Sequence, residues 1–321
     1  METVVGVLRG GLSQEHEVSL KSGSAMLAGL RGDRYVARDI YIDRAGQWHD
    51  RGRPVLPSKA LRQIDVALIA LHGEYGESGE VQQMLEAHGI PYSGADAFGT
   101  RQASHKVFGK ALAQQAKILT PEFRYAENAE KAVETAYEAV RAFHQPVVVK
   151  PVGWGSSVGV SIVGGYAAVL AAIEQLFAEG ADGVLVEELV RGREATAGIV
   201  EGMRGEALYA LPVVEIVPPG KDFFSYEAKY SGKSCEICPA HFSREETAAI
   251  QNAAREMHTA LGQRHYSRSD FILSPHGLYY LETNSAAAVG LTEESLLPKS
   301  LAAVGVKFPD FLDHLVTLAR A

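Results

Sequence analysis

Short apolar runs alternate with stretches of helical periodicity along the first hundred residues. Strands are predicted at 4–8, 36–42 and 66–71, and helices at about 18–30 and 81–88. Strands that alternate with helices usually form a parallel sheet covered by those helices. We therefore expect residues 1–100 to form an N-terminal parallel α/β domain.

The rest of the chain predicts two further units and an overall α/β fold class. The predicted strands and helices of the second unit lie at 106–116, 129–143, 147–149, 160–163, 167–179 and 184–188. The third unit mixes strands with helices near 245–261 and 294–304. We expect a small central α+β domain over 101–190 and a C-terminal mixed-sheet domain over 191–321.

Charge and cysteine content exclude several classes of function. The net charge is -8 and only 8% of residues are aromatic, so neither nucleic acid nor an anionic membrane is an expected partner. The start of the chain lacks a leader pattern, and no apolar run approaches the roughly 20 residues that span a bilayer, so we expect a cytoplasmic protein. The only cysteines, Cys235 and Cys238, lack the further ligands that a zinc site requires, and we expect two free thiols on a strand.

Two glycine-rich loops follow predicted strands. The first, Gly10-Gly11-Leu12-Ser13, could bind an anion at a helix N-terminus or form an ordinary tight turn. Glu15 would repel a pyrophosphate there, which disfavours an NAD-dependent dehydrogenase. The second loop, 150–159, begins with Lys150 and contains Ser156 and Ser157 among three glycines. It predicts a flexible hairpin over phosphates, although a plain glycine hairpin stays open.

Residues 268–284 predict a hairpin with one chemical face. If Pro275-His276-Gly277 is a three-residue loop, Ser274 opposes Leu278, Asp270 opposes Glu282 and Arg268 opposes Asn284. Because side chains two apart on a strand share a face, these last four project together. The opposite, apolar face would then consist of Phe271, Leu273, Tyr279 and Leu281.

Asp270, Glu282 and Asn284 form a set of oxygen ligands on that face. Two carboxylates and an amide oxygen suit a hard cation such as Mg²⁺, which also takes waters and phosphate oxygens. The alternative is a surface hairpin whose charges form an ordinary salt bridge. The apolar opposite face and the third oxygen favour the metal site.

Several motifs in this order resemble the D-alanine–D-alanine ligase family of the ATP-grasp superfamily, over nearly the full length of the chain. The motifs are GGLSQEHEVSLKSG (10–23), LHGEYGESGEVQ (71–82), GIPYSG (89–94), VVVKPVGWGSSVGV (147–160), VEELVRGREAT (186–196), YEAKY (226–230), RSDF (268–271) and LETN (281–284). The resemblance implies a three-domain ATP-grasp architecture, the cofactors ATP and Mg²⁺ or Mn²⁺, and a homodimer. It also implies ligation of two D-alanines into D-alanyl-D-alanine through an acyl phosphate, for peptidoglycan precursor synthesis.

The resemblance also implies a role for particular residues. Lys106, Lys150, Ser157 and Lys229 would hold phosphates, Glu187 and Val190 would meet the adenine, and Glu194 the ribose. Glu15, Ser156 and Tyr230 match the family's acid-serine-tyrosine set, with Glu15 and His72 near the first D-alanine. Arg268 and the N–H of Gly290 would stabilise the oxyanion, while Ser295 and Leu296 would anchor the second carboxylate.

The segment after Asn284 departs from the family pattern. Residues 285–290 are longer than the usual turn and lack its proline, and this segment shapes the acceptor pocket. Ser78 and Trp154 also differ from the common residues. The alternatives are therefore an ATP-grasp ligase that joins a different amino acid or hydroxy acid, and a non-catalytic nucleotide-binding protein, which the intact Lys229, Arg268 and metal set disfavour.

Overall fold

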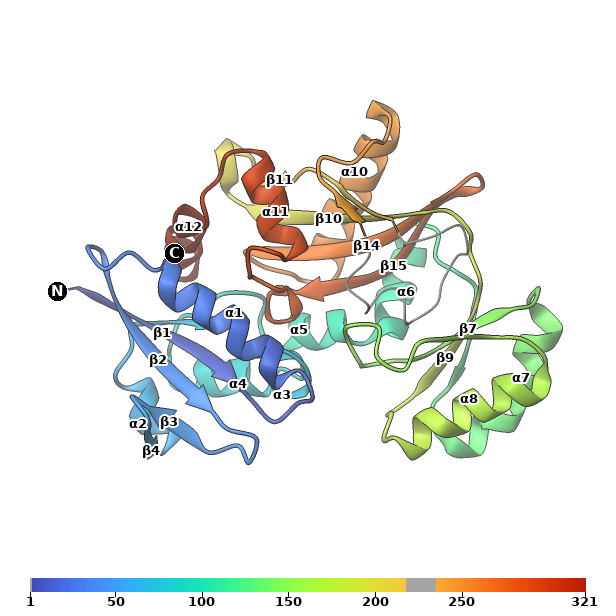
Figure 1. Cartoon of the computed structure of the whole chain (residues 1–321), viewed down its shortest axis with the longest axis horizontal. Coiled ribbons are helices and arrows are strands. Elements are labelled where there is room, and N and C mark those ends of the chain that lie inside the picture. The colour runs from blue at the N-terminus through green and yellow to red at the C-terminus, as the bar shows by residue number, and fades with distance from the viewer. Residues whose placement is uncertain (1, 218–234) are drawn as a thin grey trace.

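The computed structural model describes residues 2–217 and 235–321 (Figure 1). Among these residues the strands form three sheets. Figure 1 shows the N-terminal sheet in blue and the central sheet in green, with the C-terminal sheet in yellow to red between them. The chain thus has the α/β fold class expected from its sequence.

The N-terminal sheet is parallel at its centre and antiparallel at one edge. Its order is β4-β3-β2-β1-β5. The strands are β1 (Thr3–Gly10), β2 (Tyr35–Ile42), β3 (Trp48–Asp50), β4 (Arg53–Val55) and β5 (Val66–Ile69). Strand β1 pairs parallel with β2 and β5, as the alternation predicted. Strands β3 and β4, which were not predicted, extend β2 as an antiparallel hairpin.

The helices of this part flank the sheet and lead out of it. They are α1 (His16–Gly29), α2 (Pro57–Leu61), α3 (Glu74–Glu77), α4 (Glu80–Ala87) and α5 (Ala97–Ser104). Helices α1 and α4 match the two predicted ones.

The central sheet has the order β6-β9-β7-β8, and its described pairs are antiparallel. Its strands are β6 (Phe123–Ala126), β7 (Val147–Pro151), β8 (Ser161–Val163) and β9 (Val184–Glu188). The 3₁₀ turn η1 (Ala129–Lys131) leads into α7 (Ala132–Ala142), which packs with α8 (Tyr166–Ala178) against one face of the sheet (Figure 1). The opposite face is left for the site.

The C-terminal sheet has six described strands. They are β10 (Arg193–Glu201), β11 (Leu208–Ala210), β12 (Val214–Val217), β13 (Cys235–Ile237), β14 (Tyr266–Ser274) and β15 (Gly277–Ser285), with the turns η2 (Met203–Gly205) and η3 (Ala286–Ala288). Of these strands, β10, β14 and β15 are the longest. Helices α10 (Arg244–Ala260) and α6 (Lys106–Gln115) pack on this sheet. Helix α6 lies within the predicted central unit in the sequence but packs on the C-terminal sheet. The domain boundaries at 100/101 and 190/191 stay predictions.

The β14–β15 hairpin differs from its predicted register near the turn. Ser274 pairs with Gly277 rather than Leu278, so the turn has two residues, not three. A β-bulge between Asp270 and Phe271 then shifts the register by one residue, and Asp270 pairs with Glu282 as predicted. Leu281 is the extra residue of the bulge.

The bulge also changes the apolar face. Tyr280 and Phe271 are fully buried with their rings in edge contact, whereas Leu281 lines a cavity. The assignment of Tyr279 and Leu281 to the core face was therefore wrong. The predicted chemical face is still present, because the bulge shifts the pairing back by the one residue by which the turn differs from the prediction.

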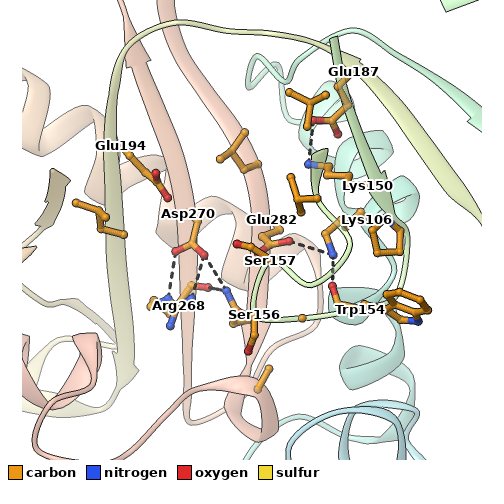
Figure 2. Close-up of a pocket in the computed structure, with 18 of the residues that line it drawn as sticks. Lys106, Lys150, Trp154, Ser156, Ser157, Glu187, Glu194, Arg268, Asp270 and Glu282 are labelled. Carbon is orange, nitrogen blue, oxygen red and sulfur yellow. Dashed lines mark hydrogen bonds and ion pairs between the residues drawn. The ribbon is translucent and has the colours of Figure 1, made fainter. Parts of the chain in front are cut away.

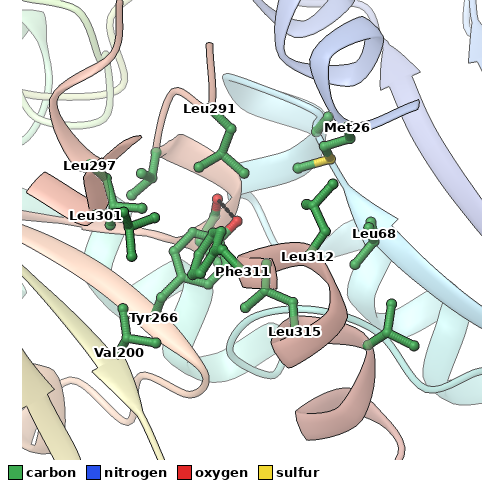
Figure 3. Packing of buried hydrophobic residues seen from close by; sticks show 14 of the residues in the cluster. Met26, Leu68, Val200, Tyr266, Leu291, Leu297, Leu301, Phe311, Leu312 and Leu315 are labelled. Carbon is green, nitrogen blue, oxygen red and sulfur yellow. Dashed lines mark hydrogen bonds between the residues drawn. The ribbon is translucent and has the colours of Figure 1, made fainter. Parts of the chain in front are cut away.

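A large apolar core joins the two ends of the chain (Figure 3). It includes side chains of β1 and β5 together with α11 (Leu296–Ala303) and α12 (Phe308–Ala319). Figure 3 shows Leu312 and Leu315 on the side of Leu68 and Met26, and the Phe311 ring against Tyr266. The C-terminal helices thus cover the N-terminal sheet.

Two smaller expectations concern the cysteines and membrane spans. Cys235 is exposed at the start of β13 and Cys238 is partly buried just beyond it, both as free thiols. In the described ranges, no helix has both the length and the apolar content to cross a membrane.

Candidate active site

A cavity of about 430 Å³ opens between the central and C-terminal sheets. Most side chains that the sequence singled out contribute to its wall, and Figure 2 shows the central ones. They are Glu15, His72, Lys106, Lys150, Ser156, Ser157, Glu187, Val190, Glu194, Arg268, Asp270, Glu282, Asn284, Gly290 and Leu296. These residues lie far apart in the sequence, and the fold brings them to one place.

One described residue that the sequence predicted, Ser295, takes no part in this wall, and two others cannot be placed. Lys229 and Tyr230 lie outside the described residues. Ser295 is described but does not line the cavity, and its hydroxyl is 2.8 Å from that of Thr292. It lies behind Gly290, where an added Cβ would be 2.8 Å from Ser295 Oγ.

The two glycine-rich loops meet at the cavity. Ser156 Oγ donates a hydrogen bond of 2.5 Å to Glu15, which follows the first loop. Ser156 and Ser157 both have left-handed backbone conformations, with φ of 51° and 54°. Non-glycine residues rarely adopt this conformation, and when they do it is often at a ligand site. The contact joins the N-terminal and central parts of the chain.

The two cavity lysines each lie against a carboxylate. Lys106, at the start of α6, is 3.2 Å from Glu282 and donates to the backbone oxygen of Trp154 at 2.7 Å. Lys150, near the end of β7, is 2.9 Å from Glu187 on β9. Both ammonium groups are nearly buried, so these pairs limit the cost of removing them from water.

Sequence reasoning missed a third lysine, Lys110, which is fully buried on α6. Its Nζ lies 2.9 Å from Glu187 and 2.7 Å from Thr120 Oγ1. Burial would raise the pKa of Glu187, but Lys110 and Lys150 together lower it. A signal existed, since Lys106 and Lys110 are four residues apart and share a helix face.

Arg268, Asp270 and Asn284 form a hydrogen-bonded group on the β14–β15 face. Arg268 donates to both carboxylate oxygens of Asp270, at 3.1 and 3.0 Å. Thr196 Oγ1 and Asn284 Nδ2 donate to the same carboxylate at 2.5 and 3.0 Å. Burial would lower the pKa of Arg268, but the charge and hydrogen bonds of Asp270 raise it. The guanidinium is therefore held in place and charged.

Asp270, Glu282 and Asn284 meet the chemical requirements of a hard cation. Removal from water would raise the pKa of Glu282, but Lys106, Lys150 and Arg268 lower it to about 2, so the carboxylate is ionised at neutral pH. Asn284 donates with its amide nitrogen, which leaves its oxygen for another partner. Three oxygen donors on one face of a hairpin fit Mg²⁺ or Mn²⁺.

Apolar side chains from both sheets form another part of the wall. The sequence did not identify them as site residues, because core positions and positions in a binding slot look alike in a strand pattern. They are Val148, Ile162, Leu189, Ile216, Ile272 and Leu281. An apolar slot beside cationic groups suits a flat ring that carries phosphates.

Glu77 and His72 lie near the first glycine loop, and both have shifted pKa values. Burial and the nearby Glu15 raise the pKa of Glu77 to about 7, and Glu77 accepts a hydrogen bond from the N–H of Gly73 at 2.7 Å. Burial and Arg268 lower the pKa of His72 to about 4. His72 is therefore neutral at pH 7, with Nε2 3.0 Å from Ser22 Oγ. Glu77, which the sequence reasoning did not name, also lines the cavity.

The segment that departs from the family pattern forms the end of the cavity. Residues 286–288 form the turn η3, which lies against α3. Ala288 and Gly290 line the cavity, together with Leu296 at the start of α11. Ala288 and Leu296 make this part of the wall apolar.

Comparisons with known proteins agree with the fold. The family model for the D-Ala–D-Ala ligase C-terminus matches residues 112–317, and that for the N-terminus matches 4–59 and 51–95. A D-alanine–D-alanine ligase of Syntrophobacter fumaroxidans is 39% identical over 98% of this chain and 97% of its own length. One of Geotalea uraniireducens is 38% identical over 98% of this chain and 95% of its own length.

Solved structures give the same result. The VanG D-Ala:D-Ser ligase of Enterococcus faecalis superposes with a TM-score of 0.87 at 28% identity, covering 99% of this chain and 100% of its own. A Bacillus anthracis D-alanine–D-alanine ligase complexed with ATP has a TM-score of 0.80 at 28% identity, covering 99% and 97%. The ATP-grasp architecture expected from the motifs is confirmed, and the chain belongs to the D-alanine–D-alanine ligase family.

Proposed function

We propose that this protein joins two D-alanines into D-alanyl-D-alanine, with ATP hydrolysed to ADP and phosphate, for peptidoglycan precursor synthesis. The observation that carries the proposal is the single cavity in which two lysines, an acidic hairpin face and the Glu15–Ser156 pair come together. Such a cavity can hold a nucleotide and an amino acid side by side. The assignment of D-alanine as the substrate rests on the family to which the chain belongs.

The nucleotide would lie along the apolar slot. Its adenine would pack between side chains such as Val148 and Leu281, near Glu187 and the backbone of Val190. Glu194 would meet the ribose, as the family resemblance implies. Lys106, Lys150 and the loop with Ser157 would hold the phosphates, since all of them line the same cavity.

A divalent cation would be held by Asp270, Glu282 and Asn284. When bound, Mg²⁺ or Mn²⁺ would neutralise the phosphate oxygens of the nucleotide. The ionised state of Glu282 at neutral pH supports this role.

The first D-alanine would bind with its ammonium at Glu15, near His72. Its carboxylate would attack the terminal phosphorus of ATP to give an acyl phosphate and ADP. Ser156 fixes the carboxylate of Glu15 through their hydrogen bond and so sets the position of this substrate. Lys229 and Tyr230 are proposed to act at the same step from outside the described residues.

The second D-alanine would displace phosphate from the acyl phosphate through its amine. Arg268 would stabilise the tetrahedral oxyanion together with the N–H of Gly290, because its guanidinium is held toward the cavity by Asp270. Ser295 and the backbone of Leu296, at the start of α11, would anchor the acceptor carboxylate. Ser295 would have to exchange its contact with Thr292 for this.

The test is phosphate release from ATP and Mg²⁺, with and without D-alanine, followed by mass analysis of the product. We expect release that depends on D-alanine, and the mass of D-alanyl-D-alanine. Acceptors offered in competition, such as D-serine and D-lactate, should be used less than D-alanine. A mixed product formed in preference to D-alanyl-D-alanine would overturn the substrate assignment and leave the ligase reaction in place.

Assembly and location are further proposals. We infer a homodimer from the family resemblance, and light scattering of the purified protein would test it. We infer a cytoplasmic location because the reaction consumes ATP, and fractionation of cells that make the protein would test that.

A further inference from the structure

Lys110 is the one lysine among the described residues that is completely buried. A buried lysine is rare unless its charge is paired. Its Nζ lies 2.9 Å from the carboxylate of Glu187 and donates a hydrogen bond of 2.7 Å to the hydroxyl of Thr120. It also lies 5.5 Å from the centroid of the Phe123 ring. The ammonium is thus enclosed by groups that favour its charged form.

Glu187 has two cationic partners on opposite oxygens. Lys110 lies against Oε1 and Lys150 against Oε2, each at 2.9 Å. Lys150 and Glu187 line the cavity, and Lys110 does not. Figure 2 shows the Lys150 ammonium on the cavity side of Glu187. Two buried cations therefore share one carboxylate, and only one of them can reach a ligand.

This arrangement matters when a phosphate enters. If Lys150 were the only partner of Glu187, its movement to a phosphate would leave a buried carboxylate without a counter-charge, which is strongly unfavourable. With Lys110 in place, Glu187 keeps a cation after Lys150 moves. Burial and Lys150 lower the pKa of Lys110 to about 8, and Glu187 acts against this shift, so the lysine is mostly charged at neutral pH.

We propose that Lys110 is a positioning residue for nucleotide binding: it neutralises Glu187 from behind and so leaves Lys150 free to bind phosphate. The inference rests on the proposed function in so far as the cavity binds a nucleotide. It assigns Lys110 no contact with the ligand.

The test compares ADP with adenosine, because only ADP carries phosphates. Lys110→Met has a similar length and no charge, so Glu187 would retain Lys150 as its sole cation. We expect the dissociation constant for ADP, measured by calorimetry, to rise about 10-fold or more. The constant for adenosine should change less than about 2-fold, because Glu187, which would meet the adenine, keeps Lys150 as its counter-charge in this variant and adenosine carries no phosphate to draw Lys150 away. Equal losses for both ligands would overturn the proposal and assign Lys110 to the fold or the base pocket.

A second pair of variants keeps the test decisive if Lys110→Met folds poorly. With Glu187→Gln there is no carboxylate to neutralise, so Lys110 should no longer matter. Adding Lys110→Met to Glu187→Gln should leave the ADP constant within about 2-fold of Glu187→Gln alone. A further large loss in the double variant would contradict the proposed mechanism.

The controls separate this inference from the proposed function. Lys131→Met, at an exposed position of η1, should bind both ligands as the unaltered protein does. If the unaltered protein binds neither ADP nor adenosine, the proposed function fails. If it binds both and Lys110→Met binds ADP equally well, only the inference about Lys110 fails.

Discussion

Lys106, Lys150 and Arg268 each lie against a carboxylate in the cavity, on Glu282, Glu187 and Asp270 respectively. Substrates therefore enter a site whose charges are already ordered, and binding exchanges one partner for another. Such order removes part of the entropy that a substrate complex would otherwise lose.

The hairpin part of this arrangement could be read from the sequence, because side chains on a strand alternate with a fixed period of two. The spacing of Lys106 and Lys110 indicates a shared helix face, but the burial of Lys110 could not be read, since a lysine on a helix is usually exposed and only the tertiary fold buries it. The raised pKa of Glu77 could not be read from the sequence either, because it also arises from burial in the tertiary fold.

Removal of the Glu282 charge should stop turnover without harming the fold. Glu282→Gln keeps the shape of the side chain but loses the negative charge that would attract a hard cation and that pairs with Lys106. We expect kcat to fall by at least about 100-fold at saturating Mg²⁺, with the circular dichroism spectrum of the unaltered protein. The control is Glu174→Gln, an exposed position on α8. Full turnover in Glu282→Gln would rule out the metal assignment.

His265 should make the protein less stable in acid. Burial and Arg264 lower its pKa to about 4, and its Nδ1 accepts a hydrogen bond from the N–H of Gly94. The unfolded chain, with a histidine pKa of about 6.5, binds more protons between these values. The free energy of unfolding therefore rises with pH from about 4 to 6.5 and is lost as pH falls through that window.

His265→Asn tests this, because asparagine can accept the same hydrogen bond and tolerates the left-handed backbone at this residue. The slope of unfolding free energy against pH should decrease by up to about 1.4 kcal/mol per pH unit in that window. Urea unfolding at a series of pH values measures the slope. His276→Asn, in the exposed hairpin turn, should leave it unchanged.

At the scale of elements, the β14–β15 hairpin shows where local patterns stop being sufficient. The alternation predicted the chemical face, but not the two-residue turn or the bulge. The N–H of Tyr280 bonds to the backbone oxygen of Leu119, far away in the sequence, and its hydroxyl is 3.0 Å from Thr283 Oγ1. These contacts hold Tyr280 in the core and leave Leu281 for the cavity, and no local sequence signal contains them.

Helix α10 offers a test at this scale, because it begins with a complete capping box. Ser243 Oγ accepts from the N–H of Glu246, and the Glu246 carboxylate accepts from the N–H of Ser243. Ser243→Ala should lower the free energy of unfolding by about 1 kcal/mol. Chemical denaturation measures this loss, and phosphate release at saturating substrate should not change. Glu246→Gln, which can keep the box, should cost less, and equal costs would refute this account.

At the scale of the whole molecule, the order of the three sheets came from the family resemblance. Composition and periodicity had predicted only the kinds of element in each unit. Helix α12 was not predicted, and neither was its packing on the N-terminal sheet, because that contact joins residues about as far apart as the chain allows.

Leu312 tests the core that this packing forms. It is fully buried in α12 among side chains of the N-terminal sheet (Figure 3). Leu312→Ala should lower the free energy of unfolding by about 2–5 kcal/mol through lost burial and a residual cavity. Leu56→Ala, at an exposed leucine, should change it by less than about 0.5 kcal/mol. Urea unfolding of both variants gives the comparison, and similar values for the two would contradict the assigned core.

The packing of α12 also bears on how the protein is made. Val5, Val7 and Leu68 leave the ribosome early, yet the side chains that cover them include Phe311, Leu312 and Leu315. Through most of translation, the part of this face that α12 covers is open to chaperones or to aggregation, while α1 covers another part. Synthesis of α12 therefore sets the earliest moment at which this face of the N-terminal sheet can be fully covered.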